Sequence, residues 1–139
     1  MFGMRKDILI AALAGFLTGV FLIPTVINND IKLGHQNLIL LLGFPILSAL
    51  GVAIARKIGE RIRIIWQLAK FALTGVLNAA IDFGILNILI TLTGASTGIQ
   101  YTLFKSASFV FANINSFFWN RNWTFQERGT GERHKYLKF

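Results

Sequence analysis

The sequence predicts an all-α integral membrane protein, with four transmembrane helices in antiparallel hairpins and an amphipathic interfacial linker. Composition, four long apolar stretches and the placement of basic residues predict this fold class. Of the 139 residues, 54% are hydrophobic and only 14% are charged, whereas about a quarter of the residues in soluble domains are charged. Mean hydropathy is +0.59. This composition excludes a disordered chain and indicates the membrane class.

The first two apolar stretches predict an N-terminal membrane hairpin over residues 1–55. Residues 8–27 carry no charge, and about twenty apolar residues span the hydrocarbon core as a helix. This run is longer than a typical signal-peptide core and a second span follows closely, so we expect a retained helix. In the second stretch, residues 38–55, Gly43 and Pro45 predict a kink. A Gly15-x3-Gly19 pair in the first stretch permits close helix packing.

Residues 56–70 form a basic amphipathic linker between the two halves of the chain. Isoleucines and Trp66 recur there at helical spacing, with Arg and Lys between them. Two arrangements fit this pattern. The segment is either a separate helix lying in the cytoplasmic interface or a cytoplasmic extension of the second or the third span.

Residues 71–125 contain the last two stretches and predict a second helix hairpin. The third span, residues 71–93, is long enough to cross the membrane, and the fourth, about residues 98–120, is less apolar. Polar residues within these two spans include Asn78, Asp82, Asn87, Lys105, Asn113 and Asn115. Residues 126–139 form a basic tail, which we expect to be cytoplasmic and to start a further helix.

The basic residues predict that both termini are cytoplasmic. Outside the spans, alternate sides of the four-helix arrangement carry twelve Lys and Arg residues against one. This is the positive-inside pattern, and it explains the net charge of +8 without a nucleic-acid partner. We therefore expect a multi-pass protein of the cell membrane that contacts anionic lipid.

Aromatic residues near the span ends are typical of an interfacial belt. Those at or just beyond predicted ends are Trp66, Tyr101, Trp119, Trp123 and Tyr136, and we group Phe125 with them. There is no Cys, and the two His are about a hundred residues apart. We therefore expect no disulfide, no metal site and no cofactor.

Asp82 lies midway along the third span, where a charged Asp costs roughly 2.5–3.5 kcal/mol on insertion scales. Gly75 and Asn78 share its helix face, and Gly75 predicts a close approach there. Lys105 lies within about one lysine side chain of the same depth in an antiparallel hairpin. Two states fit: an Asp82–Lys105 ion pair, or a protonated Asp82 with Lys105 reaching to the surface. For Asn87 and Asn113, interhelical hydrogen bonds are the plain structural expectation.

Arg121 follows the fourth span and is flanked by amides and aromatic residues. A guanidinium forms bidentate bonds to phosphate, so this segment could clamp a phosphate. The alternative is an interfacial anchor, with Arg on lipid phosphate and Trp at the glycerol level.

Two segments resemble the GtrA-like family. Phe71-Ala-Leu-Thr-Gly-Val-Leu-Asn-Ala-Ala-Ile-Asp82-Phe83 is similar to its opening helix. Lys105 to Phe125 resembles its second helix, ending in the family's Asn-Arg-x-Trp-Thr-Phe signature, here called the box. The resemblance covers about residues 67–139 and implies a small membrane protein acting on polyprenyl-phosphate-linked sugars. The positions that it implies to be substrate-binding are Asn78, Asp82, Lys105, Asn115, Asn120 and Arg121.

The sequence departs from this family in two respects. Residues 1–55 lie outside its motifs, and the family domain has two more helices after the box. A short echo of residues 67–71 at residues 135–139 fits a second hairpin that is just beginning, so we expect a C-terminally truncated domain. A homodimer is one way to complete it.

The leading functional hypothesis is a translocase (flippase) or accessory protein for polyprenyl-phosphate sugars in cell-surface polysaccharide biosynthesis. One alternative is a non-transporting membrane module that recruits or anchors a glycosyltransferase, and another is a small cation-coupled exporter using Asp82. We expect no enzymatic activity, since no paired carboxylates, activated nucleophile or Gly-rich phosphate loop is present.

Overall fold

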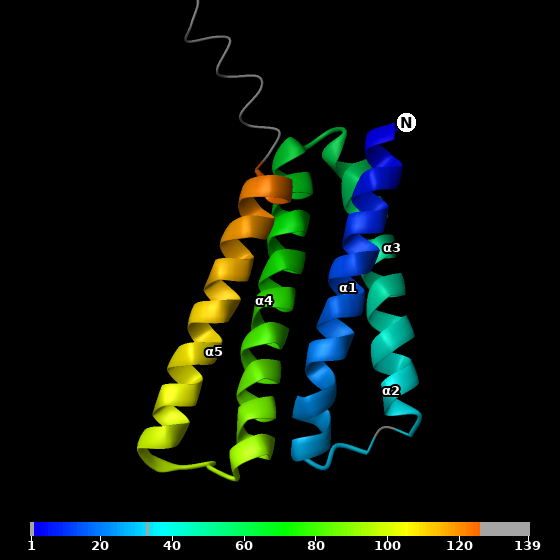
Figure 1. Cartoon of the computed structure of the whole chain (residues 1–139). Helices are drawn as coiled ribbons and strands as arrows, with labels where there is room; N and C mark the ends of the chain where they lie inside the picture. The colour runs from blue at the N-terminus through cyan, green and yellow to red at the C-terminus, as the bar shows by residue number, and fades with distance from the viewer. Residues whose placement is uncertain (1, 33, 126–139) are drawn as a thin grey trace, which may run out of the picture.

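The computed structural model describes residues 2–32 and 34–125, which form four antiparallel helical rods (Figure 1). The elements are α1 (Phe2–Asn28), α2 (Gln36–Leu38), the π-helical turn η1 (Ile39–Gly43), α3 (Phe44–Gly59), α4 (Arg63–Thr93), α5 (Gly98–Trp119) and the π-helical turn η2 (Asn120–Thr124). The described residues contain no strand. The predicted all-α membrane fold is confirmed. The predicted further helix within residues 126–139 lies outside the described residues.

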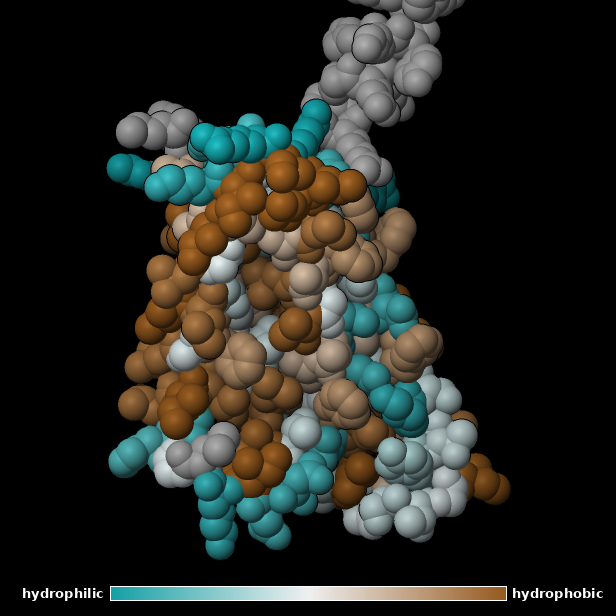
Figure 2. Space-filling model, turned by 180° about the vertical axis from the view of Figure 1, so that it is seen from behind, coloured by the Kyte–Doolittle hydropathy of each residue, from teal (hydrophilic) through white to brown (hydrophobic). Residues whose placement is uncertain are grey.

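Three of the rods are long and apolar enough to cross a membrane: Gly3–Asn28, Gln36–Gly59 and Arg63–Thr93. The fourth, α5, has 22 residues and is more polar. Exposed polar side chains on it include Gln100, Thr102, Ser106 and Asn113. Seen from behind, the surface is hydrophobic over most of the height of the bundle, with hydrophilic groups at both ends and on the side of α5 (Figure 2). This distribution is typical of a membrane bundle with one less apolar helix at its edge.

Close backbone approaches join α1 to its neighbours. A Cβ atom added at Gly15 would collide with the backbone carbonyl of Phe44, and one at Gly19 with that of Leu40. The predicted Gly15-x3-Gly19 contact is therefore present, and it packs α1 against the second rod. Gly84 of α4 approaches the Phe21 backbone in the same way. The predicted close approach at Gly75 is wrong, because this residue is exposed and a Cβ there would meet nothing within 4 Å.

The helices α1, α3 and α4 pack around one another, and α5 packs mainly against α4. Small residues allow this packing, since Ala11 and Ala14 of α1 and Ala112 of α5 are fully buried. A core cluster of Ala14, Leu77, Ile81 and Ala112 lies between α1, α4 and α5. A second cluster, near the box, contains Ala11, Val52, Ala55, Trp66 and Trp123.

The segment 56–70 is not a separate interfacial helix. Instead α3 continues to Gly59, a short turn follows, and α4 begins at Arg63. Of the two arrangements left open by the sequence, the structure therefore has extensions of the adjacent spans. The predicted irregularity around Gly43 and Pro45 coincides with η1, after which Pro45 occupies the first turn of α3, where its missing N–H is tolerated.

Candidate functional site

Asp82 and Lys105 form an ion pair across the α4–α5 hairpin. Lys105 Nζ lies 2.5 Å from Asp82 Oδ2, and the Ser108 hydroxyl donates to Asp82 Oδ1 at 2.6 Å. The Lys105 side chain is 38% exposed and lies over the ring of Phe83, 5.0 Å from its centroid. Of the two states that the sequence allowed, the structure has the pair. The pair compensates a carboxylate that would be costly alone within a membrane.

Three amide atoms of the α4–α5 hairpin and the box are buried without a hydrogen-bond partner in the described part of the chain. They are Asn78 Oδ1, Asn115 Nδ2 and Asn120 Oδ1. Asn78 lies one turn from Asp82 on α4, Asn115 shares the helix face of Ser108 on α5, and Asn120 begins the turn η2. Because buried polar groups are nearly always paired, these three atoms have hydrogen-bonding capacity that the described residues do not use.

The other two amides within the spans behave differently. The Asn87 amide donates to Thr25 Oγ1 at 3.2 Å and accepts from Asn28 at 3.1 Å, which confirms the expected interhelical hydrogen bonds. Asn113 is exposed and donates to the Phe109 carbonyl of its own helix at 2.7 Å. Asn87 therefore fastens α1 to α4, whereas Asn113 faces out of the bundle.

The box forms the turn η2, which presents Arg121 at the surface. Arg121 is exposed, and its guanidinium lies 6.0 Å from the ring centroid of Phe117. Two later residues of the turn point inward, since Trp123 is 5% exposed and Thr124 is 1% exposed. A groove of about 240 Å³ beside this turn is lined by Ile10, Phe118, Trp119, Asn122 and Trp123.

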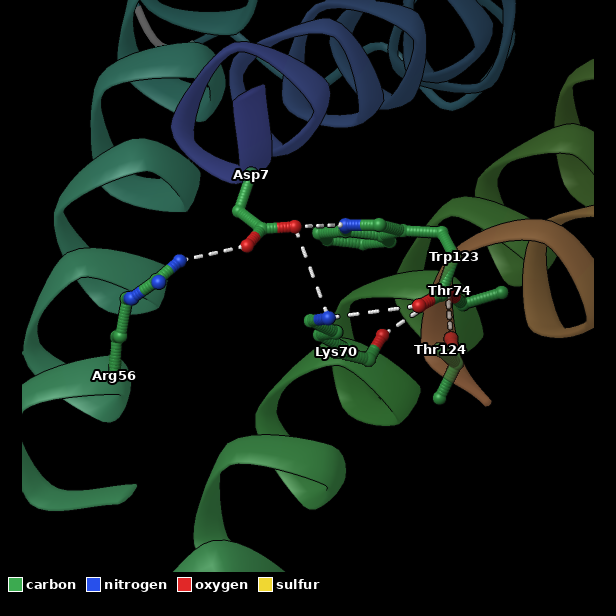
Figure 3. Close-up of polar contacts among 6 residues, drawn as sticks. All are labelled: Asp7, Arg56, Lys70, Thr74, Trp123 and Thr124. Carbon is green, nitrogen blue, oxygen red and sulfur yellow. Dashed lines mark hydrogen bonds and ion pairs between the residues drawn. The ribbon is translucent and has the colours of Figure 1, made fainter. Parts of the chain in front are cut away.

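Asp7, which sequence reasoning did not single out, lies at the centre of a polar cluster behind the box (Figure 3). Arg56 Nη1 donates to Asp7 Oδ2 at 2.8 Å, and Trp123 Nε1 donates to Asp7 Oδ1 at 2.9 Å. Lys70 Nζ lies 3.7 Å from Asp7 Oδ1. The carboxylate thus joins α1, α3, α4 and η2. The sequence feature that could have pointed to Asp7 is its position, as an acidic residue directly before an apolar stretch.

The indoles of Trp66 and Trp123 face this cluster instead of lipid. Lys70 Nζ lies 4.4 Å from the Trp66 ring centroid and 5.6 Å from that of Trp123. The prediction of an outward-facing belt is therefore wrong for these two residues, because a buried cation and a carboxylate acceptor satisfy the rings inside the bundle.

The remaining aromatic residues of the predicted belt are less enclosed. Trp119 is partly buried and packs edge-to-face on Trp123. Phe125 is 40% exposed and lies 6.4 Å from the ring centroid of Phe71. Tyr136 lies outside the described residues.

Residues 70–139 match the family described as GtrA/DPMS, transmembrane domain. The chain belongs to this family. The matched region includes α4 from Lys70 onward, all of α5 and the box. Membership, together with the three long apolar helices, makes the chain an integral membrane protein.

A relative in Bacillus subtilis (strain 168), called "Uncharacterized membrane protein YngA", is 31% identical over 72 residues. The alignment covers 52% of this chain and 45% of that protein, so the chain spans less than half the length of this relative. No solved structure matches the chain.

The GtrA/DPMS match leaves out Asp7 and Arg56, and Asp7 nevertheless contacts residues within it. Its partners Lys70 and Trp123 both lie in the matched region.

The candidate site has two parts: the Asp82–Lys105 pair inside the α4–α5 hairpin, and Arg121 on the box. Sixteen residues of helix separate Lys105 from Arg121, roughly 24 Å at 1.5 Å per residue. The structure does not bring these two parts together.

Proposed function

We propose that this chain is a translocase (flippase) or accessory protein for polyprenyl-phosphate-linked sugars in cell-surface polysaccharide biosynthesis, with no catalytic role of its own. One observation carries the proposal: Arg121 is exposed on a turn that is anchored by the buried residues Trp123 and Thr124. A guanidinium held in this way can bind a phosphate with two parallel hydrogen bonds. Membership of the GtrA/DPMS family supports a lipid phosphate that carries a sugar as the ligand class in this proposal.

The polar line along α4 and α5 supports a path for the head group. The unpartnered amide atoms of Asn78, Asn115 and Asn120 lie between the Arg121 turn and the Asp82–Lys105 pair. Sugar hydroxyls donate and accept hydrogen bonds, so they could satisfy such atoms. The groove beside Trp119 and Trp123 would receive the first part of the apolar chain.

The proposed orientation places the box at the cytoplasmic face of the plasma membrane. The start of α1, the α3–α4 turn and the box share one end of the bundle (Figure 1). That end also carries the basic residues Arg56, Lys57, Arg61 and Arg63. Basic residues beside spans favour the cytoplasmic side.

The proposal is tested by flipping of a fluorescent polyprenyl-phosphate sugar in proteoliposomes. We expect Arg121→Ala to lower the flipping rate about tenfold or more, because a charge-assisted hydrogen bond to phosphate is lost. Arg121→Lys should retain part of the rate, since it keeps the charge and loses the planar fork. Arg63→Ala is the matched control, an exposed arginine at the same end. Equal flipping by the wild type and Arg121→Ala would contradict the clamp.

A recruitment module for a glycosyltransferase is a second candidate. A groove of about 530 Å³ at the α3–α4 turn favours it, because apolar and charged side chains alternate around this groove. Its lining is Ile54, Lys57, Ile58, Glu60, Arg61 and Ile62. The test is co-purification of a glycosyltransferase. If Lys57→Ala/Arg61→Ala abolishes it while Asp82→Asn and Arg121→Ala leave it unchanged, the recruitment hypothesis replaces the translocase hypothesis.

A further inference from the structure

We propose that Asp7 is a positioning residue for Arg121, so that α1, which lies outside the family match, sets the geometry of the phosphate clamp. The role of the clamp rests on the proposed function. The mechanical part, in which Asp7 holds the turn η2, rests on the contacts alone.

Asp7 fixes residue 123 through two routes. The Trp123 indole donates directly to Asp7 Oδ1 at 2.9 Å, a contact between residues 116 positions apart in the sequence. Lys70 Nζ, 3.7 Å from the same carboxylate oxygen, also donates to the Trp123 carbonyl at 3.5 Å. One carboxylate therefore holds both the side chain and, through Lys70, the backbone of this residue.

The carboxylate is itself held in place. Arg56 of α3 donates to Oδ2 at 2.8 Å, so both oxygens of Asp7 are engaged by different helices. Asp7 is only 9% exposed and the Lys70 side chain only 3%. Because charged hydrogen bonds in such surroundings are strong and directional, Asp7 gives the Trp123 indole one position.

Fixing Trp123 fixes the backbone that carries Arg121. The two residues lie in one five-residue turn, which the Phe125 amide closes by donating to the Asn120 carbonyl at 2.9 Å. The next hydroxyl, Thr124 Oγ1, lies 3.4 Å from Thr74 Oγ1 of α4. Arg121 itself is exposed. The direction of its guanidinium is therefore set mainly by this turn and not by an enclosure around the side chain.

The mechanical part is tested by the mobility of a nitroxide label on the turn. The chain has no native cysteine, so Asn122→Cys provides a single labelling site at an exposed position. Trp123→Phe removes the indole donor and leaves the Asp7 ion pairs intact. Asp7→Leu/Lys70→Met removes the carboxylate together with the buried lysine that faces it.

We expect both changes to shorten the rotational correlation time of the label at position 122. A label at the exposed position Ser96→Cys, at the opposite end of the bundle, should not respond. Glu60→Gln, an exposed carboxylate at the box end, is the matched control for charge. An unchanged label at position 122 in Trp123→Phe would overturn the inference, whatever the protein binds.

The functional part is tested by the affinity of the purified protein for a short-chain polyprenyl phosphate. We expect Trp123→Phe and Asp7→Leu/Lys70→Met to weaken binding about tenfold or more, since small displacements of a binding group have large effects. In an Arg121→Ala background neither change should weaken it further, because residues acting through one group are not additive. A loss that persists in that background would overturn the positioning role and indicate a separate effect on the groove.

The two arms distinguish the two claims. The proposed function fails if the wild type does not bind polyprenyl phosphate, or if Arg121→Ala binds it as well as the wild type does. In that case the mobility of the label at position 122 still decides whether Asp7 holds the turn. If binding depends on Arg121 but not on Asp7 or Trp123, the positioning role fails and the proposed function stands.

Discussion

Asp7 and Asp82 each pair with a lysine, but the two lysines differ in their surroundings. The Lys70 side chain is 3% exposed, and its cluster draws on α1, α3, α4 and the box. The Lys105 side chain is 38% exposed, and its cluster draws on α4 and α5 alone. The first pair lies where three helices pack together, and the second lies at the edge of the bundle.

This difference indicates different tasks for the two pairs. Several helices fix the Asp7 cluster at once, so its geometry cannot change without moving the whole bundle end. The Asp82 pair has an open side, since the Lys105 side chain is partly exposed and α5 packs mainly against α4. We infer that the first cluster is a support and that the second is the place where a polar ligand could displace an existing interaction.

The largest expected effect is on Asp7. Asp7→Leu leaves Lys70 without this carboxylate, and removing one partner of a buried pair is destabilising by about 3–5 kcal/mol. Chemical unfolding in detergent, followed by circular dichroism, measures the loss. Asp7→Leu/Lys70→Met should recover much of it. Equal instability of the single and double variants would show that the charge on Lys70 is not the cause.

A smaller effect is expected where α1 packs against the turn η1. Gly19→Ala places a Cβ against the Leu40 carbonyl, and overpacking is destabilising by about 1–3 kcal/mol. Gly75→Ala is the matched control in the edge hairpin, where a Cβ meets open space. It should be neutral or stabilising, by up to about 1 kcal/mol, because Ala has the higher helix propensity. A stable Gly19→Ala variant in the same unfolding assay would show that α1 can shift outward.

Asp82→Asn should be milder than Asp7→Leu. The amide can still accept from Ser108, and Lys105 can extend toward the surface, so we expect a loss of about 0.6–2 kcal/mol. The same unfolding assay gives the value. If Asp82→Asn is as destabilising as Asp7→Leu, the edge pair is as much a support as the other one.

The smallest effect on stability is expected for Arg121→Ala. The side chain is exposed, so its removal should change the free energy of unfolding by less than about 0.5 kcal/mol. A functional loss together with unchanged stability would separate binding from folding at this position. A stability change of several kcal/mol would mean that Arg121 is part of the support.

Some of these features were predictable because they depend on local patterns. Apolar run lengths indicated the helices, and the Gly15-x3-Gly19 spacing indicated a close contact that the structure contains. The membrane depths of Asp82 and Lys105, compared along two antiparallel spans, also indicated their ion pair as one of the two states that the sequence allows. Residues 71–83 and 105–125 indicated the family, which the match over residues 70–139 confirms.

The sequence by itself determined the class of fold, the family and the intramembrane polar residues, because hydropathy, charge and motif spacing are properties of short segments. Only the tertiary structure decided which charges meet and which way the tryptophans face. Asp7 and Trp123 are 116 residues apart, and no helical period relates them. Their contact depends on how α1 packs against α4 and on where the box turns. That packing arises from small residues and close backbone approaches on several helices at once.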